Sequence, residues 1–452
     1  MAASFVASIL LVCSVLIAPV QSNAQTADGS TVAETPEALL VRQSSLLQQM
    51  ISDPANLDVA FEYAMVSSLL GDYEAAIGTF ERILVFAPGL AQTQLELGVL
   101  YYRLGSIPIA RFYFEQTLKA SELPDGVRAK AETYLASITE LEDPAEFRAM
   151  VVAGVRYQSN ANAAPGSRRV DLNGGSFVLD DTGVGSPDVN AFLAGRVHGA
   201  YDLGTQGDLI EADLVYYGAR YADIVRLDSA LAELTLGPSL NLERFDIDDS
   251  RLGLYAIAAG VRLNRANYNG ALGFGARLVS QITPSFLVDS KIEWRRRWYK
   301  DTGEYPTVSD RNGSYWRLAT TISKSVNRDV VLRSLILADF EETATAATQH
   351  WEVGGGIGVN YLFASPIDRL PYKWSIDLEA GYLFRQYEGP DPVVSTTETE
   401  FNYEGWVRSG LSVPLREDIA LGLVGEFRRQ YSNYDLSTYS NASALVSLSK
   451  SF

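Results

Sequence analysis

Residues 373–387 read KWSIDLEAGYLFRQY, and apolar and polar residues alternate along this stretch. The even-numbered positions from Trp374 to Phe384 are apolar. The odd-numbered positions carry the charged residues, which are Lys373, Asp377, Glu379 and Arg385. Because successive side chains of a β-strand point to opposite faces, the pattern predicts a strand with one apolar and one polar face. Aromatic residues at both ends of the apolar face are typical of a strand that faces lipid.

A second stretch, residues 286–299, repeats the pattern with more charge. One face carries Phe286, Val288, Ile292, Trp294 and Trp298. The other face carries Asp289, Lys291, Glu293, Arg295 and Arg297. We expect these five residues to line the lumen of a barrel, together with Asp377, Glu379 and Arg385. Pairs such as Glu293 with Arg295 either line a transport route or simply keep the interior wet and rigid, and we favour the second interpretation for any single pair.

Alternating segments of this kind continue from Phe147 to Phe452. About fourteen can be counted, and they begin near residues 147, 190, 209, 227, 251, 268, 285, 314, 329, 350, 373, 400, 418 and 438. If the first strand leaves the periplasm, the connections after even-numbered strands return to it, and these are short: 204–208, 281–284, 327–329 and 414–418. Connections after odd-numbered strands are mostly longer, among them 159–189, 300–312 and 387–399. Short inner turns and long outer loops are typical of outer-membrane barrels.

Both ends of the chain fit this location. The final strand presents Ala442, Ala444, Val446, Leu448, Lys450 and Phe452, an ending similar to the C-terminal signal of bacterial outer-membrane barrels, from which Lys450 departs. Residues 1–24 are uncharged and end in a small-x-small motif, Ser22-Asn23-Ala24, so we expect a signal peptide cleaved before Gln25. Cys13, the single cysteine, lies inside this segment, so no disulfide is proposed for the mature chain.

Before Phe147 the sequence has a period of 34 residues. Four positions recur in register: Gly71 as Gly105, Ala76 as Ala110, Phe80 as Phe114 and Leu84 as Leu118. This pattern resembles the tetratricopeptide repeat, in which glycine forms the tight turn between two helices and alanine lets them cross closely. We predict repeats at 57–90 and 91–124, with flanking helices at 36–51 and 125–141. The predicted fold class is therefore an N-terminal α-helical tetratricopeptide solenoid (25–146) followed by an antiparallel transmembrane β-barrel of about fourteen strands (147–452).

The resemblance to this repeat also implies a concave groove lined by the first helix of each repeat. The matching positions in this chain are Asp58, Phe61, Met65, Ser68 and Leu69, and then Gln92, Leu95, Val99, Tyr102 and Arg103. These residues are a candidate client-binding groove. The alternative is that their apolar members only pack against neighbouring helices.

Charge and motifs argue against several other functions. The net charge is −18; residues 25–146 hold 18 acidic and 7 basic side chains, and residues 147–452 hold 37 and 30. Such a balance repels nucleic acid. His198 and His350 have no ligand-like spacing, the acidic cluster at Asp246, Asp248 and Asp249 lacks the features of a calcium loop, and no helix follows the glycines at 354–356. We therefore predict no enzyme, cofactor or metal site.

Two short strings add a family resemblance. Residues 110–116 read ARFYFEQ, and residues 154–162 read GVRYQSNAN. Through these strings and its domain order, the chain resembles the surface lipoprotein assembly modulator family. The barrel of that family transports proteins across the bacterial outer membrane. The resemblance covers nearly the whole mature chain, from the repeats through the barrel, and it implies that a periplasmic repeat domain engages a client lipoprotein or secreted protein, which the barrel passes to the cell surface. Outer-membrane lipids, periplasmic chaperones and barrel-assembly machinery are the other expected partners.

Two other functions remain open from the sequence. Exopolysaccharide export porins also join tetratricopeptide repeats to barrels, although usually with far longer repeat arrays. A passive solute channel is the third possibility, and the repeat domain would be superfluous in it.

Overall fold

The computed structural model describes residues 35–120 and 123–452. The predicted signal peptide, residues 1–24, lies outside the described residues. The chain divides into two compact units, a helical one that ends at Pro144 and a barrel that begins at Ala145.

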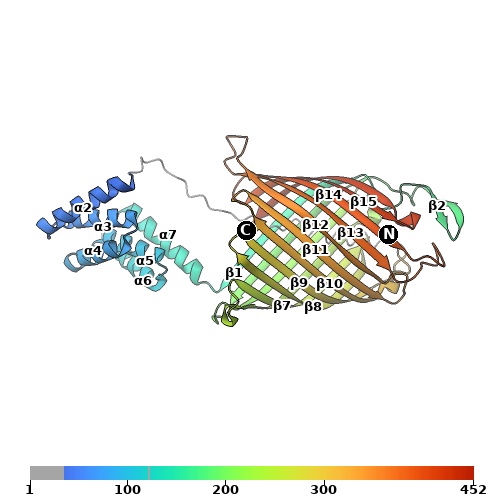
Figure 1. The fold of residues 1–452 in the computed structure, drawn as a ribbon, viewed down its shortest axis with the longest axis horizontal. Coiled ribbons are helices and arrows are strands. Elements are labelled where there is room, and N and C mark those ends of the chain that lie inside the picture. The colour runs from blue at the N-terminus through green and yellow to red at the C-terminus, as the bar shows by residue number, and fades with distance from the viewer. Residues whose placement is uncertain (1–34, 121–122) are drawn as a thin grey trace. The chain divides into compact units, whose positions relative to one another are not determined.

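The helical unit is a series of antiparallel helix pairs (Figure 1). Its helices are α2 (Pro36–Ser52), α3 (Leu57–Leu70), α4 (Tyr73–Phe86), α5 (Ala91–Arg103), α6 (Ile107–Leu118) and α7 (Asp125–Glu142). Helices α3 and α4 form the first predicted repeat, and α5 and α6 form the second. No helix of the described residues is both long and apolar enough to cross a bilayer.

The residues that recur every 34 positions occupy equivalent places in the two repeats. Gly71 and Gly105 adopt left-handed φ angles of 80° and 74°, which favour glycine and close the turn between paired helices. Two fully buried aromatic residues, Phe80 and Phe114, fill the seams between helices. Side-chain caps from Asn56 and Asp72 satisfy the first free N–H groups of α3 and α4.

The second unit is a closed antiparallel barrel of fourteen strands, which confirms the predicted fold class. In chain order its strands are β1 (Ala145–Gln158), β4 (Asp188–Asp202), β5 (Leu209–Tyr221), β6 (Ser229–Asn241), β7 (Ser250–Leu263), β8 (Ala266–Thr283), β9 (Phe286–Tyr299), β10 (Gly313–Ser325), β11 (Val330–Thr343), β12 (His350–Phe363), β13 (Trp374–Tyr387), β14 (Phe401–Pro414), β15 (Ile419–Ser432) and β16 (Tyr439–Ser451). Each strand pairs with its neighbours in sequence, and β1 closes the barrel by pairing with both β4 and β16. Every strand begins within two residues of its predicted start.

The barrel is apolar outside and charged inside. Large apolar side chains project from its outer surface, and Leu272, Val407 and Ile357 are 56%, 60% and 70% exposed. The inward-facing Glu293 and Arg385 are only 4% and 6% exposed. Because this distribution would be unfavourable in water and suits hydrocarbon, the unit is a transmembrane β-barrel of the outer-membrane kind.

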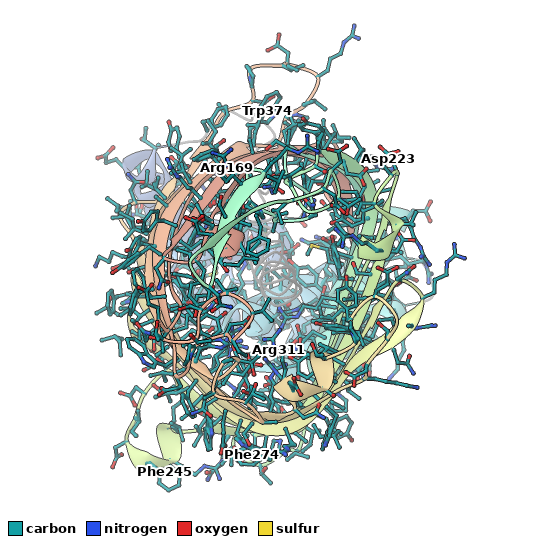
Figure 2. All side chains as sticks on the ribbon, turned by 90° about the vertical axis from the view of Figure 1, so that its right-hand side faces the viewer. Arg169, Asp223, Phe245, Phe274, Arg311 and Trp374 are labelled. Atoms are coloured by element: carbon teal, nitrogen blue, oxygen red, sulfur yellow. The ribbon has the colours of Figure 1, made fainter. Side chains whose placement is uncertain are left out.

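The two ends of the barrel differ in their connections. We call the end that carries residues 159–187, 300–312 and 388–400 the loop end, and the end with residues 203–208, 284–285, 326–329 and 415–418 the turn end. One connection at the loop end is short, because Asn264 and Arg265 form a two-residue turn with positive φ angles. The loop end also holds a small hairpin absent from the predicted strands, β2 (Arg169–Leu172) and β3 (Gly175–Val178), which leans over the barrel opening (Figure 2).

Candidate functional site: the barrel lumen, its mouth and the helical groove

All eight residues predicted to line the lumen lie on the inner face of the barrel. Five of them alternate along β9: Asp289, Lys291, Glu293, Arg295 and Arg297. The other three, Asp377, Glu379 and Arg385, lie on β13. Most of the eight are joined to residues on other strands by ion pairs or hydrogen bonds, so they form a wall of paired charges.

Glu293 and Arg295 are at the centre of the best-packed cluster in this wall. Arg295 Nη2 lies 2.8 Å from Glu293 Oε2, and Arg295 also donates to Glu233 on β6 at 3.2 Å. The hydroxyl of Tyr255 on β7 donates to Glu293 at 3.0 Å. The cluster therefore joins three strands, and it supports the interpretation that these charges stiffen the wall.

The remaining predicted lumen residues are paired in a similar way. Asp289 receives two hydrogen bonds from Arg277, at 2.9 and 2.7 Å. Asp377 pairs with Arg333, and Arg385 donates to Glu352 at 2.7 Å. Pairs that the sequence analysis did not name continue the wall around the barrel, and they are Arg196–Asp213, Arg317–Asp339, Arg408–Glu426 and Arg428–Glu404.

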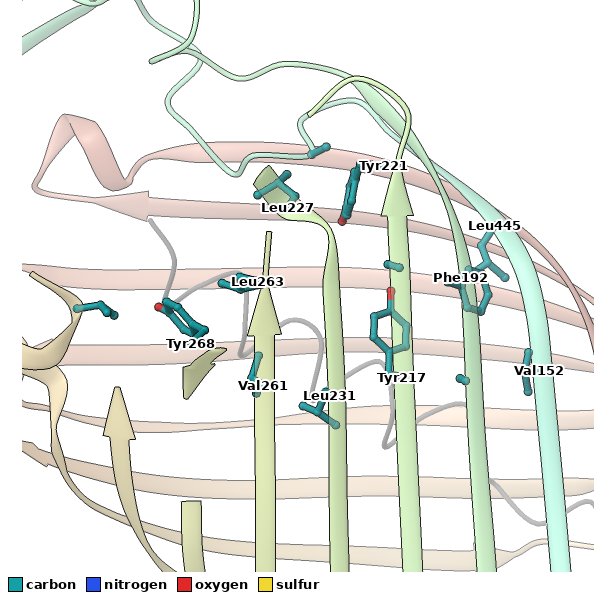
Figure 3. Close-up of a cluster of buried hydrophobic side chains, with 14 residues drawn as sticks. Val152, Phe192, Tyr217, Tyr221, Leu227, Leu231, Val261, Leu263, Tyr268 and Leu445 are labelled. Carbon is teal, nitrogen blue, oxygen red and sulfur yellow. The ribbon is translucent and has the colours of Figure 1, made fainter. Parts of the chain in front are cut away.

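Part of the inner wall toward the loop end is apolar. Side chains from β1, from β4 to β8 and from β16 form a buried cluster in which Tyr217, Phe192 and Leu231 are almost completely covered (Figure 3). Val308, from the connection between β9 and β10, belongs to the same cluster. Charged pairs such as Arg196–Asp213 lie on the same strands, so the lumen is lined by paired charges and, toward the loop end, by this apolar cluster, into which an inward-folded connection packs.

The connection 300–312 closes part of the mouth, and Arg311 points into the barrel opening (Figure 2). Arg311 Nη2 lies 3.2 Å from an oxygen of Glu341 on β11. Tyr305 packs edge-on against Tyr268 of β8, with ring centroids 5.5 Å apart. An ion pair and an aromatic contact therefore hold this connection inside the rim.

The connection 159–187 is fixed by the Asn-rich string after β1. The Asn160 side chain donates to the carbonyl of Ala164 at 2.8 Å and accepts from the Ala164 backbone N–H at 3.2 Å. Asn162 donates to the carbonyl of Val184 at 2.8 Å. Further out, the backbone N–H of Asn173 donates to the carbonyl of Val394 at 2.8 Å. The hydrogen bonds of Asn160 and Asn162 thus shape the connection 159–187, and the Asn173 hydrogen bond joins it to the connection 388–400.

One aromatic residue lies flat on the inner wall. Trp406 of β14 is 5% exposed, and a Cβ atom at Gly381 on β13 would overlap its ring. The indole N–H donates to Glu379 at 3.0 Å, which gives this predicted lumen residue its partner. Glycine at position 381 is therefore required by the close approach of a side chain, not by an unusual backbone angle.

The structure places the ten predicted groove residues in three groups. Leu95 and Val99 are 1% and 5% exposed and belong to a core cluster with Phe114 and residues of α7, so placing them in an open groove was wrong. Phe61, Met65 and Tyr102 are half-buried and pack against the helical cores. Ser68 and Gln92 are also half-buried, and the exposed members are Asp58, Leu69 and Arg103.

A tyrosine pair lies between the two repeats. Tyr101 and Tyr113 stack with ring centroids 5.7 Å apart, and the Tyr101 hydroxyl donates to Glu81 at 2.8 Å. Desolvation by burial and the hydrogen bond to Glu81 raise the pKa of Tyr101 to about 12. This contact joins α4 to α5 and stabilises the shape of the unit.

The most informative residues missed by the sequence analysis are Arg311, Glu341 and Trp406. A strand-phase argument places Glu341 and Trp406 inside the barrel, but it does not identify partners on other strands. Within residues 35–120 and 123–452, no group of three or more His, Cys, Asp or Glu side chains is arranged to hold a metal ion.

Comparison with known proteins gives distant likenesses only. No family model and no curated protein matches the chain. Among solved structures, the TPR domain of P58(IPK) is 22% identical with a TM-score of 0.22, over 23% of this chain and 29% of that chain. A bacterial polysaccharide outer membrane secretin is 10% identical with a TM-score of 0.35, over 68% and 98% of the two chains. An outer membrane channel from Pseudomonas putida F1 is 11% identical with a TM-score of 0.34, over 67% and 95%.

Proposed function

We propose that this chain is an outer-membrane translocator that exports or displays client proteins. In this proposal the helical unit lies in the periplasm and engages the client, and the loop end of the barrel faces the cell exterior. The observation that carries the proposal is the direct covalent junction between the units. Helix α7 ends at Glu142 and strand β1 begins at Ala145, so Asp143 and Pro144 are all that joins a repeat unit to a pore-forming strand.

The accessible groove residues support a role in engaging a polypeptide. Leu69 is 67% exposed although it is a large apolar residue, and Asp58 and Arg103 are exposed in the same helix series. An exposed apolar residue with charges of both signs in the same helix series fits an extended peptide better than a uniformly charged polymer. The paired charges of the lumen wall also support a polypeptide cargo, because they leave little net electrostatic field that would select a polyanion or a polycation.

An exopolysaccharide export porin is the alternative. The observation that favours it is the aromatic surface on the inner wall, since Tyr255 and Trp406 both face the lumen. Trp406 is nevertheless almost completely covered, which leaves little of its ring for a passing sugar. A passive solute channel would need neither the groove nor the covalent junction.

Deletion of residues 25–143 tests the proposal, because it keeps the predicted signal peptide and the whole of β1. The expected result is a barrel that still inserts and shows heat-modifiable migration but no longer displays small secreted proteins or lipoproteins encoded by neighbouring genes. Undiminished display, measured by protease shaving of intact cells, would remove the helical unit from the mechanism. Loss of a surface polysaccharide, with protein display unchanged, would support the alternative.

A further inference from the structure

A hollow of about 440 Å³ lies on the lipid-facing surface of the barrel, across strands β5 to β9. Large apolar side chains at its edges are exposed outward, and they include Leu234, Leu272 and Trp298 at 45%, 56% and 46%. Its floor is made of small residues, among them Gly260 and Gly270. A Cβ atom on either glycine would meet nothing within 4 Å, so the space above them is open.

The strand register places the hollow toward the loop end. Gly260 pairs with Gly270, and Gly270 pairs with Trp298, the second-last residue of β9. A strand rises about 3.3 Å per residue, so the floor lies within roughly 10 Å of the ends of β7 and β9. This depth corresponds to the boundary between acyl chains and headgroups, where tryptophan is enriched.

Two outward-facing arginines flank the hollow. Arg262 follows Gly260 on the same face of β7, and Arg296 pairs with Leu272 across β8 and β9. Both side chains are exposed. Arg262 donates to the carbonyl of Arg265 at 2.8 Å and Arg296 donates to Ser314 at 3.4 Å, and neither has a carboxylate within 4 Å among the described residues. Two unneutralised cations beside an apolar hollow match a ligand with acyl chains and phosphates.

We propose that this hollow binds a diphosphorylated, multiply acylated glycolipid of the outer leaflet. One acyl chain lies over Gly260 and Gly270 between Leu234 and Trp298, and Arg262 and Arg296 each bind a phosphate of the headgroup. The two arginines are separate along the wall, which suits a headgroup with two phosphates better than one with a single phosphate. The site requires the loop end to face the outer leaflet, as in the proposed function, but it does not depend on which cargo crosses the lumen.

The test uses the full-length chain in nanodiscs that contain diphosphoryl lipid A and phosphatidylglycerol, with bound lipid measured by native mass spectrometry. Gly260→Leu and Gly270→Leu each place a side chain in the hollow, starting from a Cβ position with no atom within 4 Å. Arg262→Gln and Arg296→Gln remove one cation each. We expect lipid A to remain bound to the wild type and to be lost from the leucine variants. Each arginine variant should weaken retention roughly fivefold.

Matched controls come from the other side of the barrel. Gly405→Leu also adds a side chain to the outer surface, and Arg429→Gln also removes an exposed outward arginine. Both controls should keep wild-type retention. Equal retention in all variants, or equal retention of phosphatidylglycerol and lipid A, would overturn the proposal. Heat-modifiable migration shows that each variant has folded, and client display measured in the same strains separates loss of the lipid site from failure of the proposed function.

Discussion

Arg311, in the connection between β9 and β10, forms an ion pair with Glu341 on the inner wall of β11, with 3.2 Å between Nη2 and Oε1. The two residues are 30 positions apart in the sequence, and the pair is nearly buried at the mouth. Arg297 lies 3.5 Å from the same carboxylate, so Glu341 accepts two cations at once. This relationship holds part of the connection 300–312 inside the mouth of the barrel (Figure 2).

Arg311→Gln should loosen the connection 300–312. Removing one partner of a buried ion pair costs about 3–5 kcal/mol, and the remaining contact with Arg297 lowers that cost here. We expect a larger single-channel conductance in planar bilayers than for the wild type. Arg333→Gln is the control, because it breaks a pair between two wall strands and leaves the loop untouched. A conductance that rises in the control but not in Arg311→Gln would contradict the role of the loop.

Gly381→Ala should destabilise the barrel, because the added methyl group overlaps the ring of Trp406. Overpacking of this kind costs about 1–3 kcal/mol. The measurement is the temperature at which heat-modifiable migration on gels is lost, and the fluorescence of Trp406 should shift with it. Gly260→Ala adds the same methyl group to open space and should leave that temperature unchanged.

Leu69→Glu and Leu95→Ala should affect the helical unit in different ways. Leu69 is exposed, so its replacement should leave the unfolding transition unchanged and reduce client display. Leu95 is 1% exposed, and truncation of such a core residue costs about 2–5 kcal/mol. Circular dichroism during thermal unfolding distinguishes the two outcomes. An unfolding temperature that falls as much for Leu69→Glu as for Leu95→Ala would show that Leu69 is not a free groove residue.

The raised pKa of Tyr101 predicts a loss of stability in alkali. Burial and Glu81 favour the protonated hydroxyl, so the folded-state pKa is about 12 against an ordinary value of 10.0. The contribution of this group is therefore fully present below pH 10 and is lost as the pH rises through about 12. Tyr101→Phe should remove that part of the pH dependence, observed as a smaller decrease in helical signal between pH 10 and 12. An identical alkaline profile would contradict the assignment.

Much of the barrel could be predicted from the sequence, because lipid on one side and charge on the other impose a strict two-residue period. Residues 373–387 illustrate this point, since Asp377, Glu379 and Arg385 were placed inside from their positions alone. The hairpin of β2 and β3 was missed although Asn173 and Gly174 form a two-residue turn with positive φ angles, which is a recognisable local signal.

Other features depend on contacts between distant residues and could not be read from local patterns. Arg311 and Glu341 meet only because the loop folds into the mouth. Leu95 and Val99 match groove positions of the repeat, but α7 covers them because Ala131 and Ile138 pack into the same cluster. Which face a flanking helix covers is decided by tertiary packing, and the sequence period does not specify it.

In the proposed mechanism a polypeptide passes from the helical unit through the lumen. Site-specific photocrosslinking in living cells tests it with probes at Leu69 in the groove and at Thr235 on the inner face of β6. The control for Leu69 is Glu115 on α6, which is also exposed. The control for Thr235 is its neighbour Leu236, which points outward from β6. We predict that one polypeptide is captured at both Leu69 and Thr235 and at neither control. Capture of a polysaccharide at Thr235, or of no polypeptide there in cells that display a client, would contradict this mechanism.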